Sequence, residues 1–303
     1  MGGIEKMEDS STGSLLVTSN APSMQRVNNF IAFFREVNEL LEKETDISPA
    51  NQLVAEVFNH LLLQLRSHFL PQEVQAILNN EYIQINQQKL RDKLSEIEFL
   101  VELRDSHEIC KLEGSALDIV KSLTNWNSYF SLVSQELQMI RQHMRQNRNT
   151  EKLPIIFVGS GPMPISSIIL HLLSDAKVIC LEMNAVAYDA SCYLLEHLGL
   201  GDKVTVVLKD GSEFDYSSYS QIFVASLVRN KQAVLETISR TSADPLVAVR
   251  TAEGMRRIMY EAIDESQLNN QGWRILGRTC PEEKLVVNST LFLERVTNSS
   301  VPN

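Results

Sequence analysis

Short β-branched runs alternate with helical patterns throughout the second half of this chain. The runs are IIFV (155–158), KVICLE (177–182), KVTVVL (203–208), QIFVAS (221–226) and PLVAVR (245–250), with helical patterns between and after them near 165–174, 185–198, 230–240 and 253–263. Such alternation predicts βαβ units and a mainly parallel, doubly wound sheet. Two further runs, at 273–280 and 286–296, flank a turn at 281–283 and predict an antiparallel C-terminal hairpin. This strand order is typical of Rossmann-like methyltransferases, so an α/β domain is expected over residues 149–297.

The first half of the chain carries only helical patterns. Apolar residues recur at helical spacing over residues 27–41. Ser48 and Pro49 predict the start of a second helix, since serine is a good N-cap and proline suits the first helical turn. Further helices are expected from Pro71, over 86–104, and from Tyr129 to about Met144. The expected organisation is therefore a disordered leader (1–22), an all-helical domain that holds the acceptor site or a lid (23–148, ending in the polar linker 141–152), the Rossmann-like domain and a tail (298–303).

Composition excludes several classes of function. The net charge of −10 argues against nucleic acid as a partner, because phosphate binding needs a basic surface. No apolar run approaches the length of a membrane span, and the N-terminus has no secretory apolar segment. The four cysteines form no CxxC pair, as is typical of reduced thiols in a cytoplasmic protein, and the six scattered histidines predict no metal site.

The loop after the first expected strand reads GSGPMP and predicts a ligand site at Gly159, Ser160, Gly161 and Pro162. Ligands of open α/β sheets bind beyond the carboxyl ends of the strands, and glycines there let the backbone approach the ligand closely. The loop is not a P-loop, because no Gly-Lys-Ser/Thr follows. It is also not a dinucleotide fingerprint, because Pro164 stands in the place of the third glycine.

Acidic residues follow the next two expected strands. Glu182, about 20 positions past the glycine loop, can accept hydrogen bonds from both ribose hydroxyls. Asp210, which precedes Gly211, can accept one from an adenine amino group. Each has a structural alternative, a solvated strand end for Glu182 and a simple turn for Asp210. Together with the glycine loop they resemble a site for S-adenosylmethionine more than one for NAD. The remaining positions expected in this cofactor site are Met183, Ala225 and Leu227.

Three passages resemble the nicotianamine synthase family, which includes bacterial and archaeal enzymes that make opine-type metallophores such as staphylopine. They are FVGSGPMPISSIIL (157–170), RTAEGMRRIMYEAID (250–264) and CPEEKLVVNSTLFLER (280–295). In that family the glycine loop reads G-S-G-P-x-P, the fifth strand runs into R-S/T-A-H-G, and the last hairpin carries H-P-x-D/E-x-V/I-V/I-N-S. A further passage, ALDIVKSLTNWNSYFSLVSQE (116–136), also resembles a family segment, and the resemblance extends over about residues 97–296.

The resemblance implies a reaction and two catalytic residues. The family transfers the aminobutanoyl (3-amino-3-carboxypropyl) arm of S-adenosylmethionine to an α-amino group, here that of histidine as leading candidate, and releases 5′-methylthioadenosine. Glu102 matches the glutamate of the family's L-L-E motif and is the candidate base, and Tyr129 is the candidate for holding a substrate carboxylate. No metal is required, a downstream opine dehydrogenase is the expected pathway partner, and a homodimer is left open.

The chain departs from the family pattern at the expected acceptor site. The family's tyrosine pair is Asn125 and Trp126 here, and the histidine of its S-A-H-G motif is Glu253. Trp126, Glu253 and Arg250 are expected to bind the acceptor, Trp126 by stacking on a ring and Arg250 by pairing with a carboxylate. Each of the residues proposed from the helical half also has a structural alternative, an exposed helix face for Glu102 and a core position for Tyr129 and Trp126. The alternative functions are nicotianamine synthesis by repeated transfers, a small-molecule N-methyltransferase and a non-catalytic cofactor-binding protein.

Overall fold

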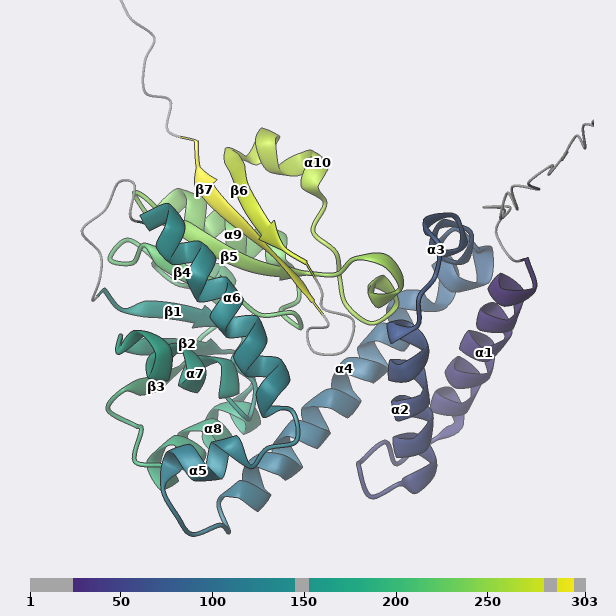
Figure 1. The fold of residues 1–303 in the computed structure, drawn as a ribbon, viewed down its shortest axis with the longest axis horizontal. Helices are drawn as coiled ribbons and strands as arrows, with labels where there is room; N and C mark the ends of the chain where they lie inside the picture. The colour runs from purple at the N-terminus through teal and green to yellow at the C-terminus, as the bar shows by residue number, and fades with distance from the viewer. Residues whose placement is uncertain (1–23, 145–152, 281–287, 297–303) are drawn as a thin grey trace, which may run out of the picture.

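The computed structural model describes residues 24–144, 153–280 and 288–296, and these fold around one mixed sheet (Figure 1). The expected leader, most of the linker, the turn at 281–283 and the tail lie outside the described residues. The strands, in chain order, are β1 (Ile155–Val158), β2 (Val178–Glu182), β3 (Val204–Leu208), β4 (Gln221–Val224), β5 (Leu246–Thr251), β6 (Trp273–Thr279) and β7 (Ser289–Arg295).

The sheet has the order β3-β2-β1-β4-β5-β7-β6. The first five strands are parallel, with β1 at the centre between β2 and β4. β7 inserts between β5 and β6 and runs antiparallel to both. The predicted doubly wound sheet with an antiparallel C-terminal pair is therefore confirmed. The chain adds β2 and β3 on one side of β1 and then crosses to the other side for β4, so the strand order switches between β1 and β4. Ligand sites of open α/β sheets lie at the carboxyl ends of the strands beside such a switch point.

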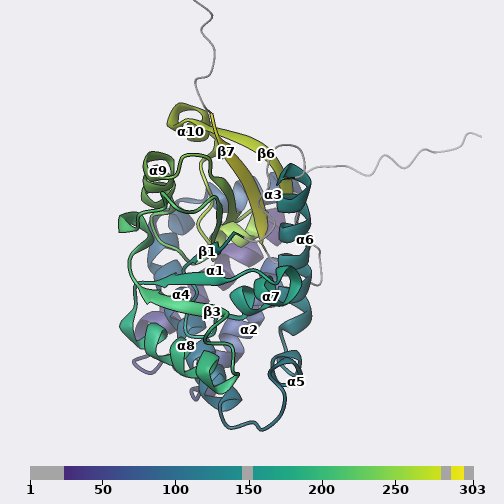
Figure 2. The same ribbon diagram turned by 90° about the vertical axis from the view of Figure 1, so that its left-hand side faces the viewer.

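Helices cover both faces of this sheet (Figure 2). They are α1 (Met24–Lys43), α2 (Gln52–Arg66), α3 (Pro71–Leu78), α4 (Glu81–Ile109), α5 (Ala116–Lys121), α6 (Trp126–Met144), α7 (Ile165–Ser174), α8 (Ala185–His197), α9 (Lys231–Thr241) and α10 (Glu265–Leu268). Helices α6, α7 and α8 pack on one face, and α9 and α10 on the other. Strands β1 and β5 are buried along their whole length, which explains why they read as continuous apolar runs rather than alternating ones, whereas the edge strands β3 and β6 are partly exposed.

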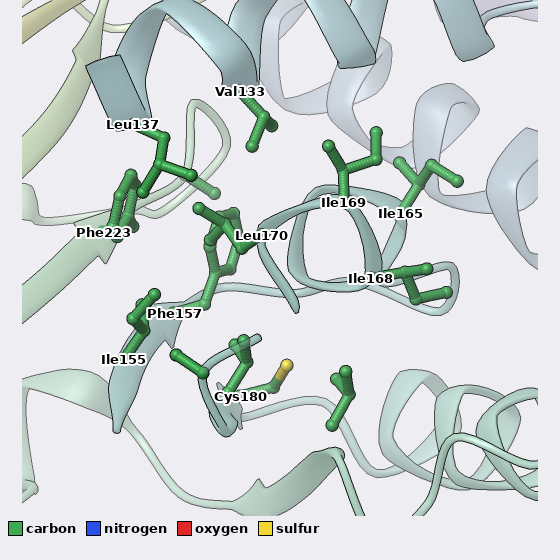
Figure 3. Packing of buried hydrophobic residues seen from close by; sticks show 14 of the residues in the cluster. Val133, Leu137, Ile155, Phe157, Ile165, Ile168, Ile169, Leu170, Cys180 and Phe223 are labelled. Atoms are coloured by element: carbon green, nitrogen blue, oxygen red, sulfur yellow. The ribbon is translucent and has the colours of Figure 1, made fainter. Parts of the chain in front are cut away.

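The core between α6, α7 and the sheet is almost entirely aliphatic and aromatic (Figure 3). Val133 and Leu137 of α6 lie over Phe157 of β1 and Phe223 of β4, whose rings stack with centroids 6.4 Å apart. Ile169 of α7 is also fully buried in this cluster. Helix α6 therefore belongs to the packing of the Rossmann-like sheet, although it lies in the helical half of the sequence.

A second apolar cluster holds α1, α2, α3 and most of α4 together. Helix α4 runs diagonally from this bundle to the sheet (Figure 1). Its first half contributes Leu90, Leu94 and Ile97 to the bundle, whereas Ile109 at its end packs with α5 and α6. The middle of α4 therefore lies next to the carboxyl ends of the strands.

Two helix boundaries differ from the sequence predictions. The predicted start of the second helix at Ser48 is wrong, because Asn51 is the N-cap and its side chain accepts hydrogen bonds from the amides of Leu53 and Val54. Ser48 instead lies in a turn, where its carbonyl accepts a hydrogen bond from Asn51 N. The helix predicted over 86–104 is longer at both ends, and its N-cap is Asn80. Helix α5 was not predicted.

The helix predicted over 253–263 is also wrong. This segment forms a short 3₁₀ turn, Gly254–Ile258, and an irregular connection to α10. Its buried side chains, Met255, Ile258 and Met259, contact the α1–α4 bundle. Apolar residues three positions apart lie on one face of a 3₁₀ turn as well as on one face of an α-helix. The apolar pattern of this segment therefore did not distinguish the two structures.

Among the described residues, no helix combines the length and apolar character that crossing a bilayer requires. The same residues bring together no group of three or more His, Cys, Asp or Glu side chains suited to a metal ion.

Candidate active site

A cavity of about 720 Å³ lies at the carboxyl ends of the central strands, roofed by α4 and α6. Every residue predicted for cofactor binding lines it: Gly159, Ser160, Gly161, Pro162, Glu182, Met183, Asp210, Gly211, Ala225 and Leu227. The predicted catalytic residues Glu102 and Tyr129 and the predicted substrate residue Arg250 line it as well. The cavity thus combines the loops of the sheet with side chains from the helical half of the chain.

The glycine loop is shaped by backbone conformations that favour glycine. Gly159 and Gly161 have φ angles of +79° and +67°, in the left-handed region. A Cβ on Gly161 would lie 2.7 Å from Glu102 Oε2, so this carboxylate sits directly against the loop. The close approach explains why position 161 requires glycine and places the candidate base over the loop.

Glu182 is held in place by backbone amides and keeps capacity for a ligand. Its Oε2 accepts a hydrogen bond from Gly161 N at 2.8 Å, and its Oε1 accepts one from Asn184 N at 2.9 Å. Each carboxylate oxygen has a second lone pair, and the side chain lines the cavity. These free lone pairs fit the pair of ribose hydroxyls that an acid at this position binds in related sheets.

Asp210 follows β3 and caps the turn that begins at Gly211. Its Oδ1 accepts hydrogen bonds from the amide and the hydroxyl of Ser212, both at 2.8 Å. Its Oδ2 has no such bond to the described residues, and remains available to an amino group in the cavity. A Cβ on Gly211 would lie 2.5 Å from Val158 Cγ1, which accounts for the glycine here.

Glu102 and Glu98 lie one turn apart on α4, and both line the cavity. Burial raises the pKa of Glu102 to about 8, the nearby charge of Glu98 adds to this, and a hydrogen bond with Tyr129 opposes it. Burial likewise raises the pKa of Glu98 to about 7, while the Tyr260 hydroxyl, which donates to Glu98 Oε1 at 2.7 Å, lowers it. The two carboxyl groups therefore titrate near neutral pH, where a general base is most effective.

Arg250 lies within β5 and forms a buried, bidentate ion pair with Glu136 of α6. Its Nε donates to Glu136 Oε1 at 2.9 Å and its Nη2 to Oε2 at 3.0 Å. Nη2 also donates to Ser166 Oγ at 3.1 Å, and Glu136 accepts from the hydroxyl of Thr290. Burial disfavours the guanidinium charge, but Glu136 outweighs this and raises the pKa of Arg250. The pairing with Glu136 leaves Nη1 as the nitrogen that can still bind a substrate carboxylate.

Two residues predicted to bind the acceptor, Trp126 and Glu253, are not among the residues that line the cavity. Trp126 begins α6, is 8% exposed and packs in the core with the sheet and α5, with its ring 5.6 Å from that of Phe130. Glu253 points away to the surface, where it pairs with Arg278 of β6 at 3.1 Å. Packing in one case and an ion pair in the other decide these orientations.

The cavity residues that were not predicted include Glu98, Tyr260 and Asn288. Glu98 could have been found, because it lies four positions before Glu102 and helix residues at that spacing share a face. Asn288 stands in the quoted V-V-N-S passage, but nothing in the local pattern assigned it a role. Tyr260 lay in a segment whose predicted helix does not form.

Comparisons with known proteins show the family to which this chain belongs. A family model described as "Nicotianamine synthase protein" matches residues 23–300. Probable nicotianamine synthase 3 of Hordeum vulgare is 24% identical over 205 residues, which are 61% of this chain and 60% of that protein. Nicotianamine synthase 2 of Arabidopsis thaliana is 26% identical over 265 residues, 79% of this chain and 77% of that protein. For the Hordeum protein the matched share is thus less than two thirds of its length.

The fold is also shared with a solved structure. A crystal structure of a variant of MtNAS in complex with S-adenosylmethionine superimposes with a TM-score of 0.70 at 19% identity, and covers 88% of this chain and 98% of that one. A second, of MtNAS in complex with MTA and tNA, gives 0.67 at 20% identity. Since the family model matches nearly the whole length of the sequence, this chain belongs to the nicotianamine synthase family.

Proposed function

We propose that this protein transfers the 3-amino-3-carboxypropyl group of S-adenosylmethionine to the α-amino group of an amino acid. The observation that carries the proposal is the position of Glu102, whose carboxylate lies directly against Gly161 of the glycine loop and hydrogen-bonds with Tyr129. A base at this point is beside the part of the cavity where the donor's reactive arm would lie. The family membership and the structures of MtNAS bound to S-adenosylmethionine and to MTA support the same reaction.

The donor's orientation follows from the acids at the strand ends. With the ribose on Glu182 and the adenine amino group near Asp210, the sulfonium and its amino-acid arm extend along the glycine loop beneath Glu102. Sulfonium carbons react by in-line displacement, which requires the amine about 3 to 3.5 Å from the attacked carbon and opposite the sulfur. Burial of the amine between α4 and the glycine loop would favour attack on the arm's methylene.

The proposed transfer needs one group that accepts a proton, one bond formed and one bond broken. Glu102 takes a proton from the acceptor's ammonium group, and the freed nitrogen lone pair forms a bond to the methylene carbon. The carbon–sulfur bond breaks, and its electron pair leaves with the sulfur as the neutral thioether 5′-methylthioadenosine. The pKa of Glu102, about 8 in the free protein, falls when the positive donor binds beside it, which favours the deprotonated form.

We further propose histidine as the first acceptor to test, an opine-type metallophore as the end product, and a downstream opine dehydrogenase as the pathway partner. The departures from the family pattern at Asn125, Trp126 and Glu253 support this choice. A cytoplasmic location is proposed on the basis of the four cysteines, Cys110, Cys180, Cys192 and Cys280, which form no disulfide.

Mass spectrometry of the purified protein with S-adenosylmethionine and a mixture of amino acids tests the proposal. The expected products are 5′-methylthioadenosine and an acceptor extended by one 3-amino-3-carboxypropyl unit. Several added units would indicate repeated transfers as in nicotianamine synthesis. S-adenosylhomocysteine with a methylated product would instead identify an N-methyltransferase, and absence of turnover despite donor binding would favour a non-catalytic protein.

A matched pair of variants on α4 tests the role of the base. Glu102→Gln is expected to abolish turnover and to leave S-adenosylmethionine binding nearly intact, because the amide keeps the shape but cannot take a proton. Glu108→Gln, on the same helix but exposed and paired with Lys111, is expected to retain full activity. Full activity of Glu102→Gln would remove this residue from the mechanism.

A further inference from the structure

We infer that Glu98 selects acceptors whose side chain carries a second basic nitrogen, an imidazole or an amine, in addition to the amino group that reacts. This inference rests on the proposed transfer reaction and assigns a specificity-determining role within the same cavity. It is carried by the placement of Glu98, by the charge balance of the cavity wall, and by an unpartnered amide oxygen in the same wall.

Glu98 lines the cavity beside the candidate base, and a side chain from another element holds one of its carboxylate oxygens. Its Oε1 accepts a hydrogen bond from the Tyr260 hydroxyl at 2.7 Å, so one oxygen is fixed from the segment after β5. Its Oε2 has no hydrogen bond to the described residues. Since residues four apart on a helix share a face, Glu98 and Glu102 offer two carboxyl groups about 5 to 6 Å apart at their Cβ atoms. This geometry suits a ligand with two nitrogen donors.

The basic side chains that line the cavity are already paired. Arg250 is bound to Glu136 at 2.9 Å, Lys209 to Glu213 at 2.7 Å, and Arg229 to Asp92 at 3.3 Å. Within the described part of the chain, Glu98, Glu102 and Glu182 line the same space without a salt bridge. Carboxylates enclosed by a ligand need a compensating cation, because an unpaired buried charge is costly. The donor brings a sulfonium, an α-ammonium and an α-carboxylate, a net charge of about +1, which is less than the negative charge of the three carboxylates. Because Glu102 takes the reacting amine, a second cation on the acceptor would compensate Glu98.

Asn288 provides the independent observation. This residue is 8% exposed and lines the cavity, and its Nδ2 donates to Ser226 Oγ at 2.6 Å. With the amide oriented in this way, its Oδ1 is buried and has no hydrogen-bond partner in the described residues. Buried polar atoms of native proteins are nearly always satisfied, so this oxygen points to a ligand with a hydrogen-bond donor, such as an N–H group. The cavity wall therefore offers more hydrogen-bond acceptors than donors, which suits a substrate with several N–H groups.

The test compares acceptors in the full-length protein. The values of kcat/KM for histidine, lysine, alanine and leucine are measured by 5′-methylthioadenosine release for wild type, Glu98→Gln and the exposed control Glu108→Gln. The wild type and the control are expected to prefer the basic acceptors. In Glu98→Gln this preference is expected to fall about 10- to 100-fold, the effect of losing a charge-assisted hydrogen bond, with little change for alanine. S-adenosylmethionine binding, measured separately, confirms that the variant is folded.

Other outcomes overturn the inference in distinguishable ways. A uniform loss for all acceptors with a raised KM for S-adenosylmethionine would assign Glu98 to the donor. Equal use of alanine and histidine by the wild type, or an unchanged preference in Glu98→Gln, would remove the specificity role while the transfer reaction stands. Failure of the wild type to release 5′-methylthioadenosine with any acceptor would reject the proposed reaction itself.

Discussion

Replacing Glu136 with glutamine tests how the helical half is joined to the sheet. Glu136 is fully buried and Arg250 is 5% exposed, and their bidentate contact links α6 to β5. Glutamine keeps the shape but leaves the guanidinium without a counter-charge. Removing one partner of a buried ion pair costs about 3 to 5 kcal/mol, because the remaining charge stays desolvated. With a urea slope of about 3 kcal/mol/M, the unfolding midpoint should fall by about 1 M or more.

Tryptophan fluorescence is a suitable probe of this transition. The chain has two tryptophans. Trp126 belongs to the apolar cluster that joins α6 to the sheet, and Trp273 is buried in the cluster on the other face of the sheet, so both report on unfolding of the sheet and the helices packed on it. Glu108→Gln, which breaks an exposed pair with Lys111, is expected to leave the midpoint unchanged. A midpoint for Glu136→Gln that matches this control would refute the assigned role of the buried pair. Combining it with Arg250→Gln should cost less than the sum of the two single changes.

Two further predictions concern the candidate base. The value of kcat/KM should rise with pH through about 8, as Glu102 loses its proton. Tyr129→Phe removes a hydrogen bond that lowers this pKa, so the rising limb should move to higher pH; a shift to lower pH would contradict the contact. Gly161→Ala places a Cβ 2.7 Å from Glu102 Oε2 and should lower kcat by about 10-fold or more in the release assay, as a small displacement of a positioned base can. Gly199→Ala has a similar positive φ but no atom within 4 Å, so it should cost only the backbone strain of about 1 to 2 kcal/mol and retain kcat. Equal activity of the two alanine variants would contradict the close approach of Glu102 to the loop.

The sequence by itself determined the sheet and the loops at its carboxyl edge. Alternating β-branched runs and helical patterns predicted the parallel strands, and GSGPMP after the first run predicted the ligand loop. These features depend on residues close in sequence, since strand and helix periodicity and the backbone freedom of glycine are local properties. All ten residues predicted for the cofactor site line the cavity for this reason: a residue that directly follows a parallel strand must lie at that edge.

Only the tertiary structure decided which side chains meet. Glu98 and Tyr260 are 162 positions apart, and Glu136 and Arg250 are 114 apart, so no local pattern could pair them. The same applies to Trp126, which packs in the core, and to Glu253, which pairs with Arg278, because contacts with distant parts of the chain set the orientation of both side chains. Helix α4 is the decisive element, since its path from the bundle to the strand ends brings Glu98 and Glu102 over a loop that lies more than fifty residues later in the chain.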